Sequence, residues 1–226
     1  MSRASFRSLA REAAARYPAR DRYARHFAYG KLTGDPVFEH ILASGLIASD
    51  ARILDLGCGQ GLLAALLAAG GRHGESRYRG IDHSHRDIER ARGAAGPNAE
   101  LIAGDIRQVA FGTADVIVLV DVLHYIEPPE QVDLLRRARA ALAPQGTLLM
   151  RIADASAGLR FRVTEAIDLA ATRLRGHSIS RLHSRPLGER RAQLEREGLR
   201  VDSLPMSAGT PFANVLLVAR YDSSSP

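Results

Sequence analysis

The segment from Ile53 to Gly61 limits the possible folds of this chain more than any other part of its sequence. It reads ILDLGCGQG, and leucines then recur at helical spacing between Leu62 and Leu67. The apolar residues before Gly57 predict a buried strand, and the leucines predict a helix directly after the glycines. Glycine is needed where φ is positive, or where a ligand must approach the backbone without meeting a Cβ atom. The sequence therefore predicts a strand, a tight turn that can bind a ligand, and a helix.

Further strand-like segments follow at intervals typical of an α/β sheet with parallel strands. The first of them, Tyr78 to Asp82, ends in a carboxylate roughly 20 residues after the turn, the offset at which Rossmann-type sheets place a ribose-binding acid. Helical segments alternate with the strands, and Pro and Gly fall between the elements. The remaining predicted strands span residues 100–106, 114–121, 199–204 and 214–219, with one more that ends at Met150.

In order and spacing, these motifs resemble those of class I S-adenosylmethionine-dependent methyltransferases that act on small molecules. The resemblance covers residues 53–150. It implies an α/β, Rossmann-like seven-stranded methyltransferase sheet, mostly parallel, with an antiparallel C-terminal hairpin and an N-terminal helical cap. The matching elements are the Gly57-x-Gly59-x-Gly61 turn after Asp55, the segment Leu123-His124-Tyr125 after the fourth strand, and Pro144-Gln145-Gly146, in which Gln145 replaces a glycine.

A nicotinamide dinucleotide is the main competing ligand for a turn of this kind. Its fingerprint has three glycines in the order G-x-G-x-x-G, and the third allows close packing of the helix on the strand. Here Leu62 occupies that third position, while Gly61 lies one residue earlier. The spacing therefore disfavours a dehydrogenase.

The 226 residues are expected to form a single methyltransferase domain. Within the N-terminal cap, one helix is expected from Ser5 to Tyr17 and another from Asp35 to Gly45, with a loop at Tyr29–Gly34 before the second. The predicted parts are the helical cap over residues 1–50, a cofactor-binding core over 51–154, a helix and loop over the acceptor site in 155–186, and a final helix with the C-terminal strands in 187–226.

Composition places the chain among ordinary globular proteins, since 46% of its residues are hydrophobic and 25% are charged. The sequence predicts neither a signal peptide nor a membrane span, which favours a cytoplasmic protein, and its single cysteine excludes an intramolecular disulfide. The net charge is +6, and ten arginines lie between Arg160 and Arg200 against five acidic residues. Such a surface is either solvated or meets an anionic partner.

For the cofactor, the resemblance implies S-adenosylmethionine, with S-adenosylhomocysteine as the product. The backbone of the turn is expected to contact the methionine part at Gly57, Cys58, Gly59 and Gly61. Asp55, which precedes them, either orients the turn or binds the ammonium group of the cofactor. A cysteine in so tight a turn is interpreted as a small structural residue rather than a nucleophile.

The adenosine part of the cofactor is assigned to residues after the next two strands. The resemblance implies that Asp82 accepts hydrogen bonds from the ribose hydroxyls and that His83 covers the adenine. Asp105 and Ile106 are expected at the adenine edge.

Three further candidates for cofactor binding lie elsewhere in the chain. Asp121 ends the fourth strand, where a helix-capping role is an alternative. Tyr29 and Lys31 belong to the predicted cap, and they either reach the carboxylate of the cofactor or face solvent.

The histidine and tyrosine directly after the fourth strand are the candidate catalytic residues. Ligands in open α/β sheets bind at the carboxyl ends of strands, and His124 titrates in a range that is useful to a general base. The alternative is that His124 and its neighbour Tyr125 pack beneath the N-terminal helices. No metal site is expected, because the sequence has neither a cysteine pair nor His-x-x-x-His spacing.

A small molecule, or an aromatic or acyl group on an acidic carrier protein, is the predicted acceptor. The segment Leu123–Tyr125 and residues 29–36 are also similar to methyltransferases encoded with bacterial aryl-polyene pigment pathways, which implies such an acceptor. A nucleic-acid acceptor is disfavoured, because residues 121–124 replace the Asn/Asp-Pro-Pro-Tyr motif of amino-directed enzymes. Two alternatives stay open: an RNA or protein methyltransferase that uses the basic C-terminal third, and a non-catalytic cofactor-binding protein of the same fold.

Overall fold

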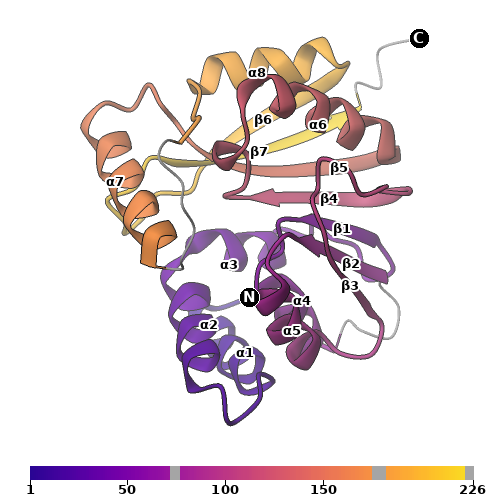
Figure 1. Cartoon of the computed structure of the whole chain (residues 1–226), viewed down its shortest axis with the longest axis vertical. Coiled ribbons are helices and arrows are strands. Elements are labelled where there is room, and N and C mark those ends of the chain that lie inside the picture. Colours follow the sequence, from indigo (N-terminus) through magenta and orange to yellow (C-terminus); the bar gives the residue numbers. More distant parts are fainter. Residues whose placement is uncertain (72–76, 175–181, 222–226) are drawn as a thin grey trace. The chain divides into compact units, whose positions relative to one another are not determined.

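The computed structural model describes residues 1–71, 77–174 and 182–221 (Figure 1). Within these ranges, seven strands form one sheet in the order β3-β2-β1-β4-β5-β7-β6. β1 pairs in parallel with β2 and β4, and β2 with β3, whereas β7 is antiparallel to both β5 and β6. This confirms the predicted sheet and its C-terminal hairpin. The strands are β1 (Arg52–Leu56), β2 (Arg77–Asp82), β3 (Ala99–Ala103), β4 (Ala114–Val120), β5 (Leu142–Ala153), β6 (Leu199–Pro205) and β7 (Asn214–Tyr221).

By their internal contacts, the residues divide into two compact units, Met1–Val118 and Leu119–Pro226. No helix in the described ranges is long and apolar enough to cross a bilayer. The helices of the first unit are α1 (Arg3–Ala15), α2 (Arg22–Gly34), α3 (Pro36–Ala43), α4 (Leu62–Ala69) and α5 (His85–Ala95). Those of the second are the 3-10 turn η1 (Leu123–Tyr125), α6 (Pro128–Ala141), α7 (Leu159–Leu174) and α8 (Leu187–Arg196).

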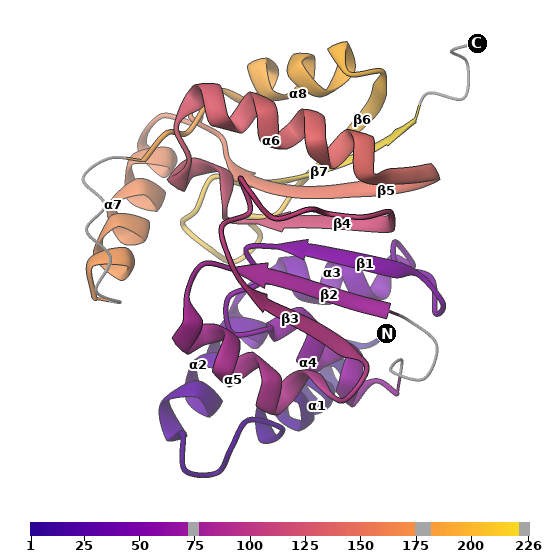
Figure 2. The same ribbon diagram turned by 45° about the vertical axis from the view of Figure 1, so that its right-hand side comes forward.

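In the first unit, α4 is buried on nearly all sides. Its residues from Leu62 to Ala68 are buried, because α4 contacts both α1 and α5. Figure 2 shows α4 and α5 beside strands β1 to β3, with α1 and α2 further from the strands. α1 turns one apolar face inwards, which includes Phe6 and Ala10. The N-terminal helices are therefore a layer of this unit's core.

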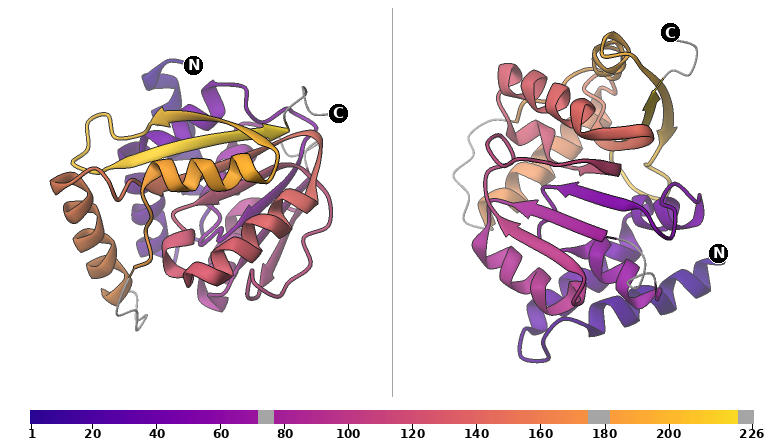
Figure 3. Two further views of the ribbon diagram at one scale, coloured as in Figure 1. Left: turned by 90° about the horizontal axis from the view of Figure 1, so that it is seen from above. Right: turned by 90° about the vertical axis from the view of Figure 1, so that its right-hand side faces the viewer.

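In the second unit, α6 and α8 pack against the antiparallel strands. α6 contacts β5 and α8 contacts β6. Seen from above, α8 runs alongside β6 and β7 (Figure 3, left). β5 is buried along most of its length, and Arg151 within it is as buried as its apolar neighbours in the sequence, Leu149 and Met150.

The structure corrects one part of the predicted cap. Tyr29–Gly34 is not a loop but the last part of α2, because Gly30 is accommodated within the helix and Leu32 is buried. Within this part, the hydroxyl of Thr33 donates to the carbonyl oxygen of Tyr29. The break comes later. The carboxylate of Asp35 caps α3 by accepting from the backbone N–H of Val37, with a proline in the first turn.

The other helix predictions are confirmed with small shifts at their ends. The first helix ends two residues earlier than predicted, and α7 (Leu159–Leu174) is the helix expected within residues 155–186. Ser84 caps α5, because its hydroxyl accepts from the backbone N–H of Asp87. Residues 176–181, which belong to the loop expected before residue 187 and include His177, lie outside the described residues. The single-domain organisation stays a prediction.

Gly61 joins the glycine turn to α4 and has a left-handed backbone, with φ at +71°. A Cβ atom at this position would lie 2.8 Å from the Cβ atom of Ala91 on α5, which is well inside the optimal separation of two carbon atoms. The third glycine of the turn is thus required both by its backbone conformation and by the close packing of α4 on α5.

We predict that Gly61→Ala lowers the free energy of unfolding by about 2–4 kcal/mol, because it adds a packing clash to the cost of a left-handed L residue. Gly45→Ala is the matched control. Gly45 has nearly the same φ of +70°, and no described atom lies within 4 Å of the added Cβ, so its loss should be about 1–2 kcal/mol. Urea unfolding measures both variants. Equal losses would contradict the packing role, and adding Ala91→Gly to Gly61→Ala should restore part of the stability.

Candidate functional site

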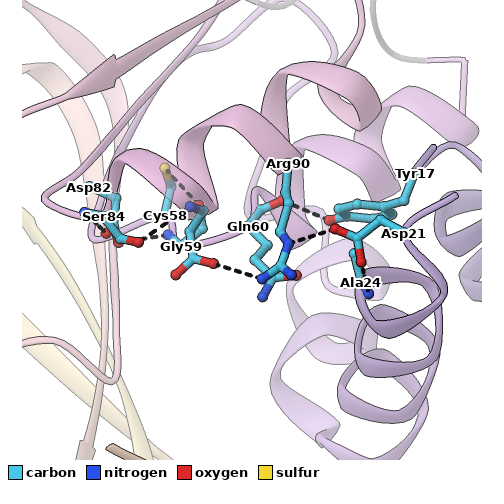
Figure 4. Close-up of polar contacts among 10 residues, drawn as sticks. Tyr17, Asp21, Ala24, Cys58, Gly59, Gln60, Asp82, Ser84 and Arg90 are labelled. Atoms are coloured by element: carbon cyan, nitrogen blue, oxygen red, sulfur yellow. Dashed lines mark hydrogen bonds and ion pairs between the residues drawn. The ribbon is translucent and has the colours of Figure 1, made fainter. Parts of the chain in front are cut away.

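The carboxylate of Asp82 joins two turns, one after β1 and one after β2 (Figure 4). Its Oδ2 accepts a 2.8 Å hydrogen bond from the backbone N–H of Gly59, and its Oδ1 accepts a 2.8 Å bond from that of Ser84. Asp82 is 9% exposed. Each carboxylate oxygen can accept about two hydrogen bonds, so both oxygens keep capacity for a further donor. The side chain is fixed by the backbone and can still bind a pair of adjacent hydroxyl groups.

The glycine turn is held against β2 by its own backbone. The N–H groups of Gly57 and Cys58 both donate to the carbonyl oxygen of Ile81, at 2.7 and 3.1 Å, and the N–H of Gly61 donates to the carbonyl oxygen of Cys58. Gly59 has φ at +53°, and no described atom lies within 4 Å of the position that a Cβ would take. A ligand can therefore approach the backbone closely at Gly59.

Cys58 is packed as a structural residue. Its sulfur lies 2.8 Å from the position of a Cβ on Gly80, so the thiol fills the space which that glycine leaves. Burial raises the pKa of the Cys58 thiol well above its usual range, and Asp55 and Asp82 act in the same direction. A thiol that stays protonated is a poor nucleophile, which fits the structural interpretation of this cysteine.

Tyr17, just after α1, reaches the glycine turn. Its hydroxyl is buried and donates a 2.7 Å hydrogen bond to the carbonyl oxygen of Gln60 (Figure 4). The side chain of Gln60 is also buried, and its Oε1 has no hydrogen-bond partner among the described residues. A buried acceptor without a donor costs about 1–3 kcal/mol. Gln60 is therefore a candidate ligand contact.

A second link joins the N-terminal helices to α5. The Nε of Arg90 donates to Oδ2 of Asp21 at 2.8 Å, and the guanidinium lies 3.5 Å from Oδ1 of Asp87. Asp21 also caps α2 by accepting from the backbone N–H of Ala24. This backbone hydrogen bond, followed by the one from Arg90, lowers the pKa of Asp21. The N-terminal helices are thus anchored to α5 through Asp21, in addition to their contact with the glycine turn through Tyr17.

Asp55 is buried in β1, where its Oδ2 accepts a 2.5 Å hydrogen bond from the hydroxyl of Tyr78. Burial raises the pKa of this carboxyl to about 7, against the lowering effect of the Tyr78 hydrogen bond. Burial also raises the pKa of Tyr78. The contact between the two side chains favours the first of the predicted roles of Asp55, orientation of the turn.

The residues assigned to the adenine follow β2 and β3. The side chain of His83 is 69% exposed, with its Nδ1 3.4 Å from Oδ1 of Asp82. Asp105 has a partner of its own, because both the backbone N–H and the guanidinium of Arg107 donate to its carboxylate. These hydrogen bonds lower the pKa of Asp105. Ile106 is buried. The three residues therefore differ in exposure, and an adenine would meet Asp105 as a carboxylate already paired with arginine.

Tyr29 and Lys31 both lie on α2, and each has a partner outside that helix. The Nζ of Lys31 forms a 2.8 Å ion pair with Asp35. The guanidinium carbon of Arg11 lies 6.0 Å from the centroid of the Tyr29 ring. A cofactor carboxylate would have to compete with Asp35 for this lysine.

In the second unit, Asp121 is paired with Arg151 of β5. The Nε of Arg151 donates to Oδ1 of Asp121 at 2.8 Å, and its Nη2 contacts Oδ2. Arg151 is buried, and a buried guanidinium that loses its counter-ion is strongly destabilising. The backbone of Asp121 is left-handed, with φ at +58°, which is uncommon for a residue other than glycine. Asp121 is therefore first of all the counter-ion of Arg151.

His124 and Tyr125 lie in η1, and their ring centroids are 4.1 Å apart. His124 is 7% exposed, and its Nε2 has no hydrogen-bond partner among the described residues. Burial lowers the pKa of His124 to about 4; Asp121 opposes this shift and Arg151 adds to it. The imidazole is therefore neutral at pH 7 and has a buried nitrogen without a partner among the described residues. Tyr125 is partly exposed beside it.

Several residues that shape these sites have no local sequence signal. The contacts of Tyr17 with Gln60 and of Arg107 with Asp105 depend on the folded geometry of turns and helix ends. Arg151 is an exception, because a lone charge within an apolar strand indicates a buried partner. The residues that sequence reasoning did not identify are Tyr17, Gln60, Arg90, Arg107 and Arg151.

Comparison with known protein sequences finds a family model whose match includes the glycine turn. Residues 53–146 match the model of a family described as a methyltransferase domain. Carboxy-S-adenosyl-L-methionine synthase of Salmonella arizonae is 31% identical to this chain over 115 residues, and that of Salmonella paratyphi B is 30% identical. Each match covers 49% of this chain and 47% of the relative. The chain thus spans about half the length of the curated relatives it matches.

Solved structures are similar over most of the chain. The magnesium protoporphyrin IX methyltransferase of Synechocystis, solved with bound S-adenosylhomocysteine, has a TM-score of 0.64 at 19% identity, over 89% of this chain and 88% of that one. The mitomycin 7-O-methyltransferase has a TM-score of 0.63 at 25% identity, over 89% and 58%. An S-adenosylmethionine-dependent methyltransferase of Methanosarcina mazei has a TM-score of 0.60 at 21% identity, over 80% and 96%. These similarities confirm the predicted fold class.

We predict that Asp55→Asn flattens the pH dependence of stability between about pH 4 and pH 7. The pKa of Asp55 is about 7 in the folded protein, against an ordinary 3.8. In this window the folded state keeps a proton that the unfolded state has lost, so the free energy of unfolding falls as the pH rises. Asparagine still accepts a hydrogen bond from Tyr78 but does not titrate. The substitution therefore removes a pH-dependent loss of about 2–4 kcal/mol in the free energy of unfolding. Urea unfolding at pH 4.5 and pH 7.5 compares both proteins, and parallel pH dependences would contradict the prediction.

Proposed function

We propose that this chain is a class I S-adenosylmethionine-dependent methyltransferase that transfers the methyl group of S-adenosylmethionine to a small molecule. The match of residues 53–146 to a methyltransferase-domain model and the similarity of the fold to solved methyltransferases support this proposal. S-Adenosylhomocysteine is the second product. The observation that carries the proposal is the carboxylate of Asp82, which the backbone N–H groups of Gly59 and Ser84 hold in place while both oxygens keep acceptor capacity. This arrangement suits the two neighbouring hydroxyls of a ribose.

The glycine turn suits the methionine part of the same cofactor. The backbone N–H groups of Gly57, Cys58, Gly59 and Gly61 already donate within the protein, so these residues offer the ligand contacts along the backbone other than N–H donors. The open side of Gly59 gives the ligand room to approach. The unpartnered Oε1 of Gln60 supplies an acceptor for an ammonium group.

The remaining candidates have secondary roles in this proposal. Asp55 orients the turn from within β1, and His83, Asp105 and Ile106 border the adenine. Three more candidates already have partners within the protein and would have to bind the cofactor alongside them: Tyr29, Lys31 and Asp121.

When bound, the cofactor supplies a methyl group activated by a sulfonium sulfur, and the protein has to align the acceptor and exclude water. We assign the acceptor side to His124 and Tyr125. A neutral imidazole with an unpartnered Nε2 can accept a hydrogen bond from the hydroxyl group of the molecule to be methylated, and can take its proton. The adjacent Tyr125 ring offers an apolar contact. A hydroxylated aromatic molecule suits this pair of side chains.

The acceptor is a small molecule in this proposal, either unattached or bound to an acidic carrier protein. Structural neighbours whose names give an acceptor act on a porphyrin and on mitomycin. The arginines of residues 160–200 support a nucleic-acid acceptor less well. Arg190 is buried, and Arg191 and Arg200 are paired with Glu195 and Asp202. These three are therefore engaged within the protein.

We predict that the protein binds S-adenosylhomocysteine and does not bind NAD, as measured by calorimetric titration. Asp82→Ala should weaken this binding by about 1–3 kcal/mol, because the ribose hydroxyls lose a charged acceptor. The matched control is Asp115→Ala, which removes an aspartate of the same unit that pairs with Arg52 at the surface. It should leave the affinity unchanged. Binding of NAD alone, or equal affinities of the two variants, would overturn the cofactor assignment.

We predict that His124→Gln lowers kcat by about 10²–10⁴-fold, because the acceptor loses its base. Turnover is measured with methyl-labelled S-adenosylmethionine and a panel of hydroxylated aromatic acids. The control is His40→Gln, because His40 also has a buried, unpartnered Nε2. Since the pKa of His124 is about 4, and only the neutral base is competent, kcat/KM should fall as the pH drops through about 4. An acid limb near the ordinary histidine pKa would contradict the role of a buried neutral imidazole.

The same assay separates the alternatives by their products. The curated relatives are named for a carboxylated S-adenosylmethionine. If mass spectrometry finds this product and no methylated acceptor, the proposed methyl transfer is contradicted. Methyl incorporation into RNA or protein would change the acceptor class. Binding of S-adenosylhomocysteine without turnover on any of these acceptors would indicate a non-catalytic binding protein.

A further inference from the structure

A buried amide lies where three chain segments of the second unit meet. Gln131, on α6, is 0% exposed. Its Nε2 lies 2.9 Å from the carbonyl oxygen of Leu123, 2.8 Å from that of Ile126 and 2.9 Å from that of His183. The backbone N–H of His183 in turn donates to the carbonyl oxygen of His124 at 2.8 Å. One side chain therefore ties both ends of the η1 turn to the chain at residue 183.

Arg190 of α8 sets the orientation of this amide. Its guanidinium donates to Oε1 of Gln131, and also to Oε1 of Gln193 at 2.7 Å. Arginine can only donate, so the oxygen of Gln131 faces Arg190 and the NH₂ group faces the three carbonyl oxygens. Arg190 is 2% exposed. Burial lowers the pKa of Arg190 to about 10, so the guanidinium is charged at pH 7 and the orientation persists.

Glutamine is the side chain that these neighbours require. Three carbonyl oxygens surround a nitrogen with two hydrogens, and a buried carbonyl that loses its donor is costly. An apolar residue of similar size satisfies none of them. Glutamate has the same shape, but when ionised it presents only acceptors to the three carbonyls.

We propose that Gln131 is a positioning residue for His124. By fixing η1 and the chain at His183 together, it sets where the imidazole presents its unpartnered Nε2. Arg190 acts one step further away, by orienting the amide. The inference rests on the proposed function in that His124 is the residue that touches the acceptor, while Gln131 does not.

The test compares two isosteric substitutions of glutamines that both accept hydrogen bonds from Arg190. Gln131→Glu keeps an acceptor towards Arg190 but turns a carboxylate oxygen to the three carbonyls, so it should release η1. Gln193→Glu is the matched control, because it gives Arg190 the same carboxylate away from the amide of Gln131. NMR follows the imidazole of His124 from pH 3 to pH 8, and His124→Gln assigns its signal.

In Gln131→Glu, we expect the pKa of His124 to rise from about 4 towards its ordinary value of 6.5, because the released imidazole is hydrated. Amide hydrogen exchange at residues 123–126 should quicken by about tenfold or more. Both readouts should match the wild type in Gln193→Glu. With the best acceptor of the panel, kcat should fall by about tenfold or more in Gln131→Glu, while the dissociation constant for S-adenosylhomocysteine is unchanged.

Unchanged titration and exchange in folded Gln131→Glu would overturn the inference, whatever the protein catalyses. Full kcat in that variant would also overturn it. If the wild type transfers no methyl group, the proposed function fails by itself, because titration and exchange need no cofactor. Should Gln131→Glu not fold, Gln131→Asn makes the same comparison, since its shorter amide is withdrawn from the carbonyls.

Discussion

Two backbone hydrogen bonds to the carboxylate of Asp82 hold the glycine turn and the start of α5 in a fixed relation. Without them, the backbone at Gly59 has many more conformations open to it, and Ser84 loses the geometry in which it caps α5. Tyr17 secures the same turn through the carbonyl oxygen of Gln60. The groups that we propose to face the cofactor in this unit are mostly backbone atoms, so their placement depends on the buried side chains around them.

The order of strands and the glycine turn were predictable from sequence because their signals are local. Apolar runs, glycines and N-cap residues lie within a few positions of the element that they define. The error at Tyr29–Gly34 has a physical cause. A glycine within a helix costs only about 1 kcal/mol, so Gly30 is compatible with a helix whose next residues, such as Leu32, are buried in the core.

The candidate site was predictable only where chemistry follows directly from position at a strand end. Asp82 and His124 belong to this class, because the carboxyl ends of strands carry ligands in this architecture. The side chains that fix the chain around His124 were not predictable, since Gln131 lies on α6 and Arg190 on α8. The low pKa of His124 also has no local origin, because it results from burial in the folded protein.

The pair formed by Asp121 and Arg151 restricts how this protein can change in evolution. Position 121 needs a residue that tolerates a φ of +58° and also neutralises a buried guanidinium. Glycine and asparagine meet the first demand but not the second, and glutamate meets the second but not the first. Aspartate meets both. A homologue that replaces Arg151 with an apolar residue is released from this restriction, so positions 121 and 151 should covary among related sequences.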